Sequence, residues 1–273
     1  MKFNIKKFVK YLKWCKQGGY TQVDLAYITY PKILEGRRAI ISGGSDGIGL
    51  AIAKKMLECG AEVVITGRNE QKLERAKQIL ASDKLHTIQW DVRDFNNMQS
   101  KLLEAKRLLG GRIDTFVNNA GVVAPLPDSD DYLGDVMDTN VKAVYLLCDL
   151  VGADMKTNNG SDGGKIINIS SLNGFQKEAH PYHISKRAVN AITEGFAKRF
   201  APYNIIVNGI APGYCNSNCN KIASGDNMYY DEHLNHRIVT PEEIAEIAVF
   251  LCSNAANGII GQTILCDGGA SLR

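Results

Sequence analysis

Seven short runs rich in β-branched residues follow one another from about Arg38 onward, separated by stretches with the periodicity of amphipathic helices. Short β-branched runs of this kind are typical of parallel strands buried on both faces of a sheet. The runs are Ala39–Ser42, Glu62–Thr66, His86–Trp90, Thr115–Asn118, Lys165–Ser170, Ile205–Ile210 and Thr263–Cys266. Repeated β-α-β units with right-handed crossovers build a doubly wound sheet. We therefore predict an α/β fold with a seven-stranded parallel sheet and helices on both faces.

Two of the expected helices carry recognisable end signals. The stretch Ile48–Cys59 is followed by Gly60, and glycine readily takes the left-handed conformation that ends a helix. The stretch Pro241–Cys252 follows Thr240, whose hydroxyl can cap the helix, and Glu243 stands three positions after that cap. Both helices are therefore expected to begin and end close to these residues.

The composition fits one large domain, which we place at residues 36–273. The chain has 273 residues, of which 45% are hydrophobic, enough to fill a core of that size. Its seven cysteines are an odd number without a Cys-x-x-Cys pair, a pattern typical of free thiols in the reducing cytoplasm. We therefore predict a cytoplasmic protein without a metal site. No apolar run reaches about 18 residues, so no membrane-spanning helix is expected.

Residues 1–35 stand apart as a basic, amphipathic extension. Residues 1–23 contain six lysines and no acid, whereas the net charge of the whole chain is only +3, so the remainder is net negative. The net negative charge of this remainder argues against nucleic acid as a ligand. The apolar face of a helix expected within residues 1–19 consists of Ile5, Phe8, Val9, Leu12 and Cys15. A helix this short needs a surface, and we favour its own domain or a neighbouring subunit over an anionic membrane or a solvated tail.

A glycine-rich stretch joins the first expected strand to the first expected helix. Glycines there let backbone amides approach a pyrophosphate, and the helix N-terminus adds a favourable dipole. The residues expected to contact a dinucleotide are Gly43, Ser45, Asp46, Gly47, Ile48 and Gly49. A tight turn without a ligand is the alternative, but the position between strand and helix favours a Rossmann-type site.

The spacing Gly-x-x-x-Gly-x-Gly resembles that of the short-chain dehydrogenase/reductase family. The other motifs that carry the resemblance are Asn118-Asn119-Ala120-Gly121, Asn140, Ser171, Tyr182 with Lys186, and Pro212-Gly213, in that order. The resemblance spans roughly residues 36–270 and extends to 3-oxoacyl carrier-protein reductases and related sugar and polyol dehydrogenases. It implies hydride transfer between a nicotinamide cofactor and a small-molecule carbonyl or alcohol substrate. It also implies cofactor contacts from Asn119, Ala120, Gly121, Pro212 and Gly213.

The residues after the second expected strand bear on cofactor choice. An acid there would bond the ribose hydroxyls and select NAD(H), but Gly67 has no carboxylate and Arg68 follows it. A guanidinium suits the 2′-phosphate of NADP(H), so we favour NADP(H) over NAD(H). Asp46 counts against this choice, because the family's NADP-users often carry a basic residue there. The resemblance also places Asp91 and Val92 beside the adenine.

Tyr182 and Lys186 are the expected proton-transfer pair. They are four positions apart at the start of an expected helix, which places both on one face. A tyrosine has a pKa of about 10, and a neighbouring ammonium lowers it by roughly 1–3 units toward working pH. By resemblance, Ser171 bonds the substrate oxygen, with Ser170 the second candidate, and Asn140 supports Lys186 through a water. Lys186 would also hold the nicotinamide ribose.

The substrate is constrained less tightly than the reaction. Residues 214–236 occupy the family's usual substrate lid, and Ser217 stands where a residue that contacts the nicotinamide amide is often found. The lid is rich in asparagine and histidine, which favours a polar or sugar-like ketone, while the resemblance also suggests a 3-oxoacyl thioester. The loop between Ser171 and Tyr182 is slightly shorter than usual. A non-catalytic NADP-binding module is the alternative function.

The helix that begins near Tyr182 is expected, largely by resemblance, to build a subunit interface in a homotetramer or homodimer. Packing of its apolar stripe on one face of the sheet is the alternative; the residues of that stripe at helical spacing are Ala188, Val189, Ile192, Phe196 and Phe200. His180 and His183, which flank Tyr182, are expected to be loop or helix-surface residues rather than substrate contacts.

Overall fold

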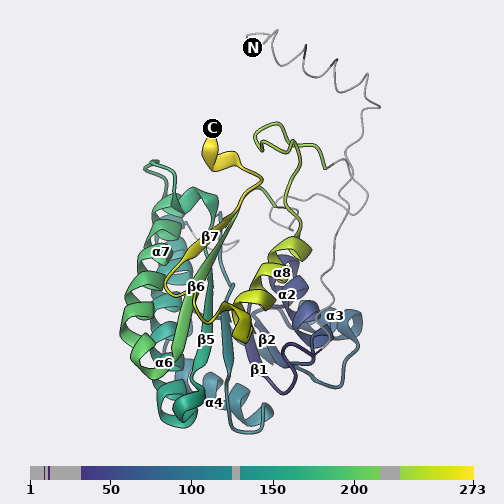
Figure 1. Cartoon of the computed structure of the whole chain (residues 1–273), viewed down its shortest axis with the longest axis vertical. Coiled ribbons are helices and arrows are strands. Elements are labelled where there is room, and N and C mark those ends of the chain that lie inside the picture. Colours follow the sequence, from purple (N-terminus) through teal and green to yellow (C-terminus); the bar gives the residue numbers. More distant parts are fainter. Residues whose placement is uncertain (1–8, 10–11, 13–31, 125–129, 216–227) are drawn as a thin grey trace.

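The computed structural model describes residues 9, 12, 32–124, 130–215 and 228–273. Its centre is a sheet of seven strands in the order β3-β2-β1-β4-β5-β6-β7 (Figure 1). The strands are β1 (Arg38–Ser42), β2 (Glu62–Gly67), β3 (Leu85–Gln89), β4 (Thr115–Asn118), β5 (Gly164–Ile169), β6 (Ile205–Pro212) and β7 (Thr263–Cys266). All neighbouring pairs are parallel, and each strand begins and ends within two residues of the predicted run. The predicted α/β fold is confirmed.

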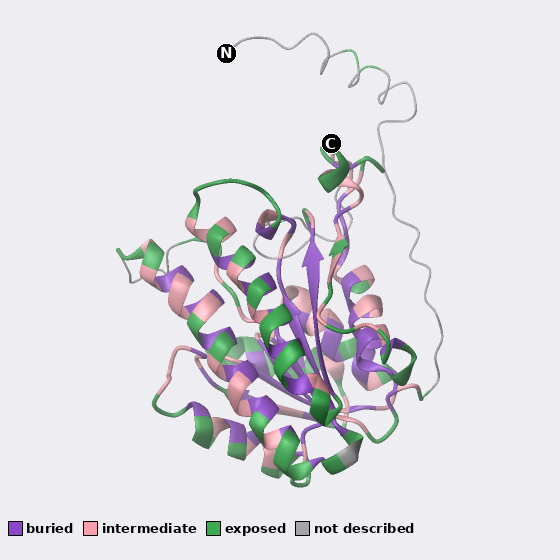
Figure 2. Ribbon diagram, turned by 60° about the vertical axis from the view of Figure 1, so that its left-hand side comes forward, coloured by how far each residue is buried: buried purple, intermediate pink, exposed green. Residues whose placement is uncertain are grey.

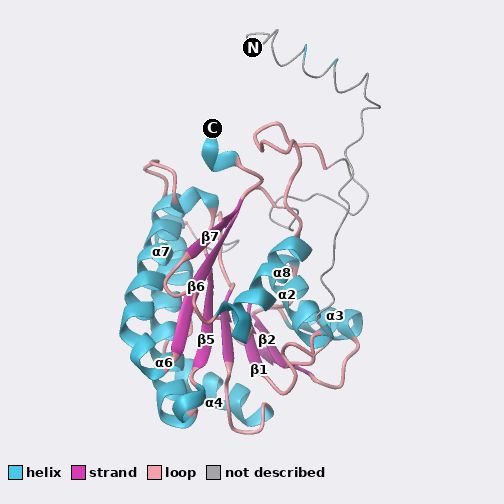
Figure 3. Cartoon of the chain, in the orientation of Figure 1, coloured by secondary structure: helices cyan, strands magenta, loops and turns pink. Residues whose placement is uncertain are grey.

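Helices cover both faces of the sheet (Figure 3): α2, α3 and α8 pack on one face, and α4, α6 and α7 on the other. The helices are α2 (Gly47–Glu58), α3 (Glu70–Leu80), α4 (Met98–Leu108), α5 (Tyr132–Met137), α6 (Ala143–Asn158), α7 (Pro181–Phe200) and α8 (Pro241–Cys252). A π-helical segment, Asp138–Lys142, joins α5 to α6. Among the described residues, no helix has both the length and the hydropathy that a membrane crossing requires.

The predicted end signals of α2 and α8 are confirmed. Gly60 follows α2 with a φ of +97°, and its amide donates to the carbonyl of Leu57. At the start of α8, the Thr240 hydroxyl accepts from the Glu243 amide at 3.3 Å, and the Glu243 carboxylate accepts from the Thr240 amide at 2.9 Å. This reciprocal capping satisfies two amides that an uncapped helix would leave without partners.

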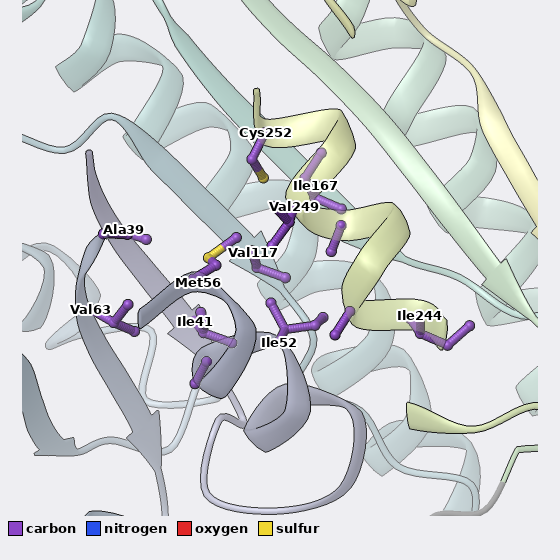
Figure 4. Close-up of a cluster of buried hydrophobic side chains, with 14 of the residues drawn as sticks. Ala39, Ile41, Ile52, Met56, Val63, Val117, Ile167, Ile244, Val249 and Cys252 are labelled. Carbon is purple, nitrogen blue, oxygen red and sulfur yellow. The ribbon is translucent and has the colours of Figure 1, made fainter. Parts of the chain in front are cut away.

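The core consists of two apolar layers, one on each face of the sheet. In the first, Ile52 and Met56 of α2 gather with Val249 of α8 above Val117 of β4 (Figure 4). Strands β4, β5 and β6 are buried throughout, and buried residues run along the sheet in Figure 2. Leu34, near the end of the segment that the sequence set apart as an extension, is buried in the first layer.

The apolar stripe of α7 faces the molecule's own sheet. Val189, Phe196 and Phe200 are buried in the second layer, so these three residues of the stripe pack on the domain itself, while Ala188 and Ile192 are partly exposed. Their helical spacing is explained by burial of one helix face against the domain itself. The exposed face of α7 carries Ile184, Arg187, Ala191, Glu194, Gly195 and Lys198 instead.

The strand order reverses where β1 lies between β2 and β4. In open α/β sheets such a reversal leaves a crevice outside the carboxyl ends of the strands, which is where ligands bind. Because the sheet is parallel, the loops that follow β1, β2, β4, β5 and β6 all meet at this edge. The residues singled out in the sequence lie in or next to these loops.

Candidate active site

The glycine-rich loop after β1 is held against the loop after β4. The Ser42 hydroxyl accepts from the amides of Asn119 and Ala120 at 3.0 and 3.1 Å. The Asn119 side chain donates to the carbonyls of Ser42 and Gly43 at 3.0 and 2.9 Å. A Cβ at Gly43, whose φ is +64°, would lie 2.9 Å from the Cα of Ala120, and one at Gly49 would overlap the Asn119 amide. Only glycine fits either place, so these two glycines let the loop after β4 pack directly on the backbone in front of α2.

The end of β2 lies beside this loop, at the position expected to select the cofactor. Gly67 has no side chain, and a Cβ built there would lie 3.1 Å from the Ser45 hydroxyl oxygen. The strand therefore ends beside Ser45 without an acidic side chain. Arg68 is exposed. Asp46 caps α2 through the Gly47 amide, and its other oxygen accepts from Lys72 Nζ at 2.9 Å. The carboxylate that counted against NADP(H) is therefore paired with a cation from α3.

Asp91, after β3, is engaged by a neighbouring arginine. It accepts from the Arg93 amide at 2.9 Å and from the Arg93 guanidinium at 2.8 and 3.2 Å. Burial opposes ionisation of Asp91, but the hydrogen bonds from Arg93, together with the charge of Arg68, hold its pKa below the ordinary value. Arg93 also reaches Asp135 of α5 at 3.4 Å, and Val92 is buried. Asp91 thus stays ionised, with its orientation fixed by Arg93.

The two serines after β5 take different roles. Ser170 is buried, and its hydroxyl donates to the Lys186 carbonyl at 3.1 Å and to Asn190 Oδ1 at 2.6 Å. Ser171 is partly exposed and accepts from the Asn173 amide at 3.2 Å. Ser170 therefore ties β5 to α7, while Ser171 is the serine whose hydroxyl lies nearer to solvent.

Tyr182 and Lys186 lie in the first turns of α7. The Lys186 ammonium is 5.7 Å from the centre of the Tyr182 ring, and it donates to the Ile169 carbonyl at 2.8 Å. Lys186 is only 5% exposed, whereas Tyr182 is partly exposed. A Cβ at Gly121 would be 3.6 Å from Lys186 Nζ, so the loop after β4 passes close to this cation. The arrangement places a buried positive charge behind a phenol that solvent can reach.

Asn140 lies in the π-helical segment and is fully buried. Its side chain accepts from the Val122 amide at 2.9 Å and donates to the Val122 carbonyl at 2.9 Å and to the Ser185 hydroxyl at 3.1 Å. The Ser185 hydroxyl in turn donates to the Tyr182 carbonyl at 2.7 Å. Asn140 therefore connects the loop after β4 to the turn of α7 that carries Tyr182.

The two histidines beside Tyr182 have local partners. His180 caps α7, since its Nδ1 accepts from the Tyr182 amide at 3.3 Å, and its ring contacts Tyr132 edge-on at 5.8 Å. His183 Nε2 lies 3.4 Å from a carboxylate oxygen of Glu178. Both histidines therefore help to shape the short loop in front of α7.

The lid begins directly after Pro212 and Gly213, at the end of β6. Ser217 lies outside the described residues. In the described part, Tyr214 stacks on Tyr230 with ring centres 4.5 Å apart, and His233 is only 1% exposed. His233 was counted among the polar lid residues, but it is buried within the lid, which weakens the composition argument for a polar substrate.

Four residues of this region were missed in the sequence: Ser42, Lys72, Arg93 and Ser185. Lys72 alone carries a recognisable signal, because it lies in the first turn of a helix, where acids are the favoured residues. The other three have polar side chains of ordinary types, and only the contacts described above distinguish them.

A parallel sheet of this order, with a glycine-rich loop after β1 and a tyrosine–lysine pair after β5, defines a class of nicotinamide-dependent oxidoreductases. Residues 43–271 match the family model described as enoyl-(acyl carrier protein) reductase. The chain belongs to the short-chain dehydrogenase/reductase family, as the motifs indicated. It is an oxidoreductase that acts on alcohol and carbonyl groups.

Relatives that are named for different activities match most of the chain. Gluconate 5-dehydrogenase of Gluconobacter oxydans is 34% identical over 250 residues, covering 88% of this chain and 96% of the relative. The 3-oxoacyl-(acyl-carrier-protein) reductase of Chlamydia muridarum is 34% identical, covering 87% and 98%. A crystal structure of 3-ketoacyl-(acyl-carrier-protein) reductase from Brucella melitensis, complexed with NADH, matches with a TM-score of 0.79 at 27% identity, covering 87% and 99%.

Proposed function

We propose that this protein is an NADP(H)-dependent oxidoreductase that interconverts a carbonyl group and a secondary alcohol, with Tyr182 as its acid and base. The observation that carries the proposal is the buried Lys186 ammonium 5.7 Å from the centre of the Tyr182 ring. A cation at this range favours the phenolate form of a tyrosine. The pair lies at the sheet edge where the glycine-rich loop opens, as proton transfer beside a bound nicotinamide requires.

In this proposal each polar side chain of the site has a defined role. Tyr182 gives its proton to the carbonyl oxygen during reduction and takes it back during oxidation. Ser171 bonds the same oxygen and orients the carbonyl, while Lys186 holds the nicotinamide ribose and compensates the phenolate. Asn140 supports Lys186 through a water and, through Ser185, holds the turn that carries Tyr182. The bound nicotinamide supplies or accepts the hydride.

The cofactor is proposed to lie across the carboxyl edge of the sheet. Its pyrophosphate would meet the backbone in front of α2, and Asp91 and Val92 would bracket the adenine. The remaining contacts come from Asn119, Ala120, Gly121, Pro212, Gly213 and Ser217. This assignment is supported by the position of the glycine-rich loop directly before the N-terminus of α2, at the carboxyl edge of the sheet.

NADP(H) is proposed as the preferred cofactor because the protein carries positive charge where the adenine ribose is expected to bind. Arg68 and the Ser45 hydroxyl would bind the 2′-phosphate, and the absence of a side chain at Gly67 leaves room beside Ser45. Lys72 compensates Asp46, so that carboxylate repels a phosphate less than its position suggests. The relative from Brucella melitensis was crystallised with NADH, which makes a direct comparison of the two cofactors necessary.

The substrate is proposed to be a 3-oxoacyl thioester or a polar, sugar-like ketone. Both classes occur among the names of the relatives. The deciding experiment follows NADPH oxidation over a panel that contains acetoacetyl thioesters, keto-sugar acids and simple ketones. Turnover with one class supports the proposal. Tight NADPH binding without turnover on any carbonyl, or on the matching alcohols with NADP+, would indicate the non-catalytic module instead.

We expect the protein to form a homodimer or homotetramer through the exposed face of α7. That face presents Ile184 and Ala191, and on the neighbouring α6 Tyr145 is 49% exposed. Replacing Ala191 by glutamate would place like charges opposite each other in a symmetric contact and should shift the protein to monomers. Light scattering at micromolar concentration measures the state. An unmutated protein that is only monomeric would contradict the expectation.

We expect residues 1–19 to dock on protein, either on this domain or on a neighbouring subunit. Of this segment only Val9 and Leu12 lie within the described residues, and both are 46% exposed in the single chain. Deleting residues 1–19 should lower the melting temperature by a few degrees, as loss of about 1 kcal/mol does in a domain of this size, or change the oligomeric state. Calorimetry and light scattering test this. Salt-sensitive binding to anionic vesicles by the full chain, absent after deletion and with stability unchanged, would instead support a membrane surface.

A further inference from the structure

Asn190 is a buried residue of α7 that joins the end of β5 to the turn containing Ser171. The residue is only 8% exposed. Its Oδ1 accepts from the Ser170 hydroxyl at 2.6 Å, and its Nδ2 donates to the Gly174 carbonyl at 3.3 Å. A carbonyl oxygen can only accept, so Gly174 determines which end of the amide faces the turn. Both polar atoms of Asn190 therefore hold neighbouring segments of its own chain.

The turn that Asn190 holds begins with Ser171. Ser171 caps a short 3₁₀ helix, Leu172–Gly174, because its hydroxyl accepts from the Asn173 amide at 3.2 Å. The Gly174 amide donates back to the Ser171 carbonyl at 2.9 Å, so these two residues are the ends of one hydrogen-bonded turn. Since the Ser171 hydroxyl accepts in this cap, its proton can be donated to a carbonyl oxygen. A bond that fixes the Gly174 carbonyl therefore limits where this hydroxyl can move.

The turn packs directly on the backbone of α7. A Cβ at Gly174 would lie 2.8 Å from the carbonyl carbon and oxygen of Lys186, and 3.1 Å from Asn190 Nδ2. The Lys186 carbonyl also accepts from the Ser170 hydroxyl at 3.1 Å. The turn and the end of β5 are therefore both held against α7 at Lys186 and Asn190.

Tyr182, Lys186 and Asn190 follow one another at intervals of four residues along α7. This spacing places successive side chains on one face of a helix. The first two residues are the proposed proton-transfer pair. The third holds the turn that carries Ser171, the residue proposed to bond the substrate oxygen. One face of α7 thus carries the proton donor, its cation and the support of the orienting serine.

We propose that Asn190 is a positioning residue, whose hydrogen bonds to Ser170 and Gly174 hold the Ser171 hydroxyl where it can bond the same oxygen as Tyr182. The inference rests on the proposed function of Ser171 and Tyr182. Two donors must reach one carbonyl oxygen together, and a misplacement of about 1 Å can cost roughly 100-fold in rate. Asn190 itself touches neither substrate nor cofactor, so NADPH binding and the pH dependence of kcat should not depend on it.

Two substitutions and one control separate positioning from packing. Asn190→Ala removes both hydrogen bonds, and Asn190→Leu removes them while keeping most of the side-chain volume if the first variant folds poorly. Asn159→Ala is the matched control, because Asn159 is also buried and donates to the carbonyls of Ile113 and Gly163 at 2.8 and 2.7 Å. Asn159 lies between α6 and β5, at the opposite edge of the sheet from Ser171. Each variant is assayed for kcat, KM, NADPH affinity and melting temperature.

We expect either Asn190 variant to lower kcat/KM by roughly 10- to 100-fold, with NADPH affinity within about twofold and the pH dependence of kcat unchanged. Asn159→Ala should lower the melting temperature by a few degrees and leave kcat/KM within about twofold. Asn190 variants with the kcat/KM of the unmutated protein would overturn the proposal. So would an equally large loss of NADPH affinity, since Asn190 would then act on the cofactor site.

A double-mutant cycle with Ser171→Ala tests whether Asn190 acts through Ser171. If Asn190 serves to orient the hydroxyl, the hydroxyl contributes little once Asn190 is replaced. Ser171→Ala should therefore lower kcat/KM by about tenfold or more in the unmutated protein, and by less than about threefold in Asn190→Ala. In Asn159→Ala it should keep its full effect. Equal effects of Ser171→Ala in all three backgrounds would overturn the proposal.

A final measurement needs no substrate and therefore separates this proposal from the proposed function. Hydrogen exchange of the Gly174 amide should be about tenfold faster or more in Asn190→Leu than in the unmutated protein, because the turn opens more readily without its bond to α7. Equal exchange rates would overturn the proposal even if the enzyme proved active. A protein inactive on every carbonyl and alcohol would refute the proposed function and the kinetic role of Asn190, while faster exchange would still establish that Asn190 holds the turn.

Discussion

Replacing Tyr182 by phenylalanine is expected to lower kcat by about 10² to 10⁴-fold, the usual contribution of a positioned acid or base. The substitution keeps the ring beside Lys186 and removes the only proton that the proposed reaction can pass to the carbonyl oxygen. The melting temperature and the affinity for NADPH should change little, since the backbone of Tyr182 still accepts from Ser185. Steady-state kinetics and cofactor fluorescence titration measure these quantities.

Tyr203→Phe is the matched control for this experiment. Tyr203 lies just before β6 begins, at the opposite edge of the sheet from Tyr182, and its ring contacts Lys156. Its phenol takes no part in the proposed chemistry, so full turnover is expected. A Tyr182→Phe variant with kinetics like those of this control would show that another group transfers the proton.

Replacing Arg68 by alanine is expected to weaken NADPH binding by about 10- to 100-fold. Hydrogen bonds to a charged group contribute roughly 1.5–3 kcal/mol, and each 1.4 kcal/mol is a factor of ten in affinity. NADH lacks the 2′-phosphate, so its affinity should change less than about twofold. The ratio of the two dissociation constants, measured by titration for each protein, tests the cofactor assignment. Equal affinity for NADPH and NADH in the unmutated protein would refute it.

Two further variants test which residues cause the preference for NADPH over NADH. Lys72→Ala leaves the Asp46 carboxylate without its cation, so NADPH binding should weaken while NADH binding is retained. Arg75→Ala, on the same helix as Lys72 and exposed, is the control for a general loss of positive charge and should leave the ratio unchanged. If Arg75→Ala and Arg68→Ala behave alike, long-range charge rather than a specific phosphate contact sets the preference.

The strands and helix ends were predictable because their determinants are local. The run Ile205–Ile210 has Asn208 as its only polar side chain, a pattern typical of a strand buried on both faces, and β6 is buried from end to end. The reciprocal cap of Thr240 and Glu243 involves residues three positions apart. The order of motifs also determined the family, since parallel strands bring successive carboxyl-end loops to one edge.

Tertiary structure decided which side chains meet. Lys72 and Asp46 are 26 positions apart, and their pairing depends on how α3 packs beside the glycine-rich loop. The helical spacing of Val189 and Phe196 was visible in the sequence, but periodicity shows only that one face is apolar, not whether it packs on the domain or on a partner. His233 read as a polar lid residue and is enclosed by Gly213 and Gly268 from two distant segments. Sequence by itself determined the elements and their chemistry, while the packing of those elements determined partners and burial, because contacts between distant segments depend on geometry that local preferences do not encode.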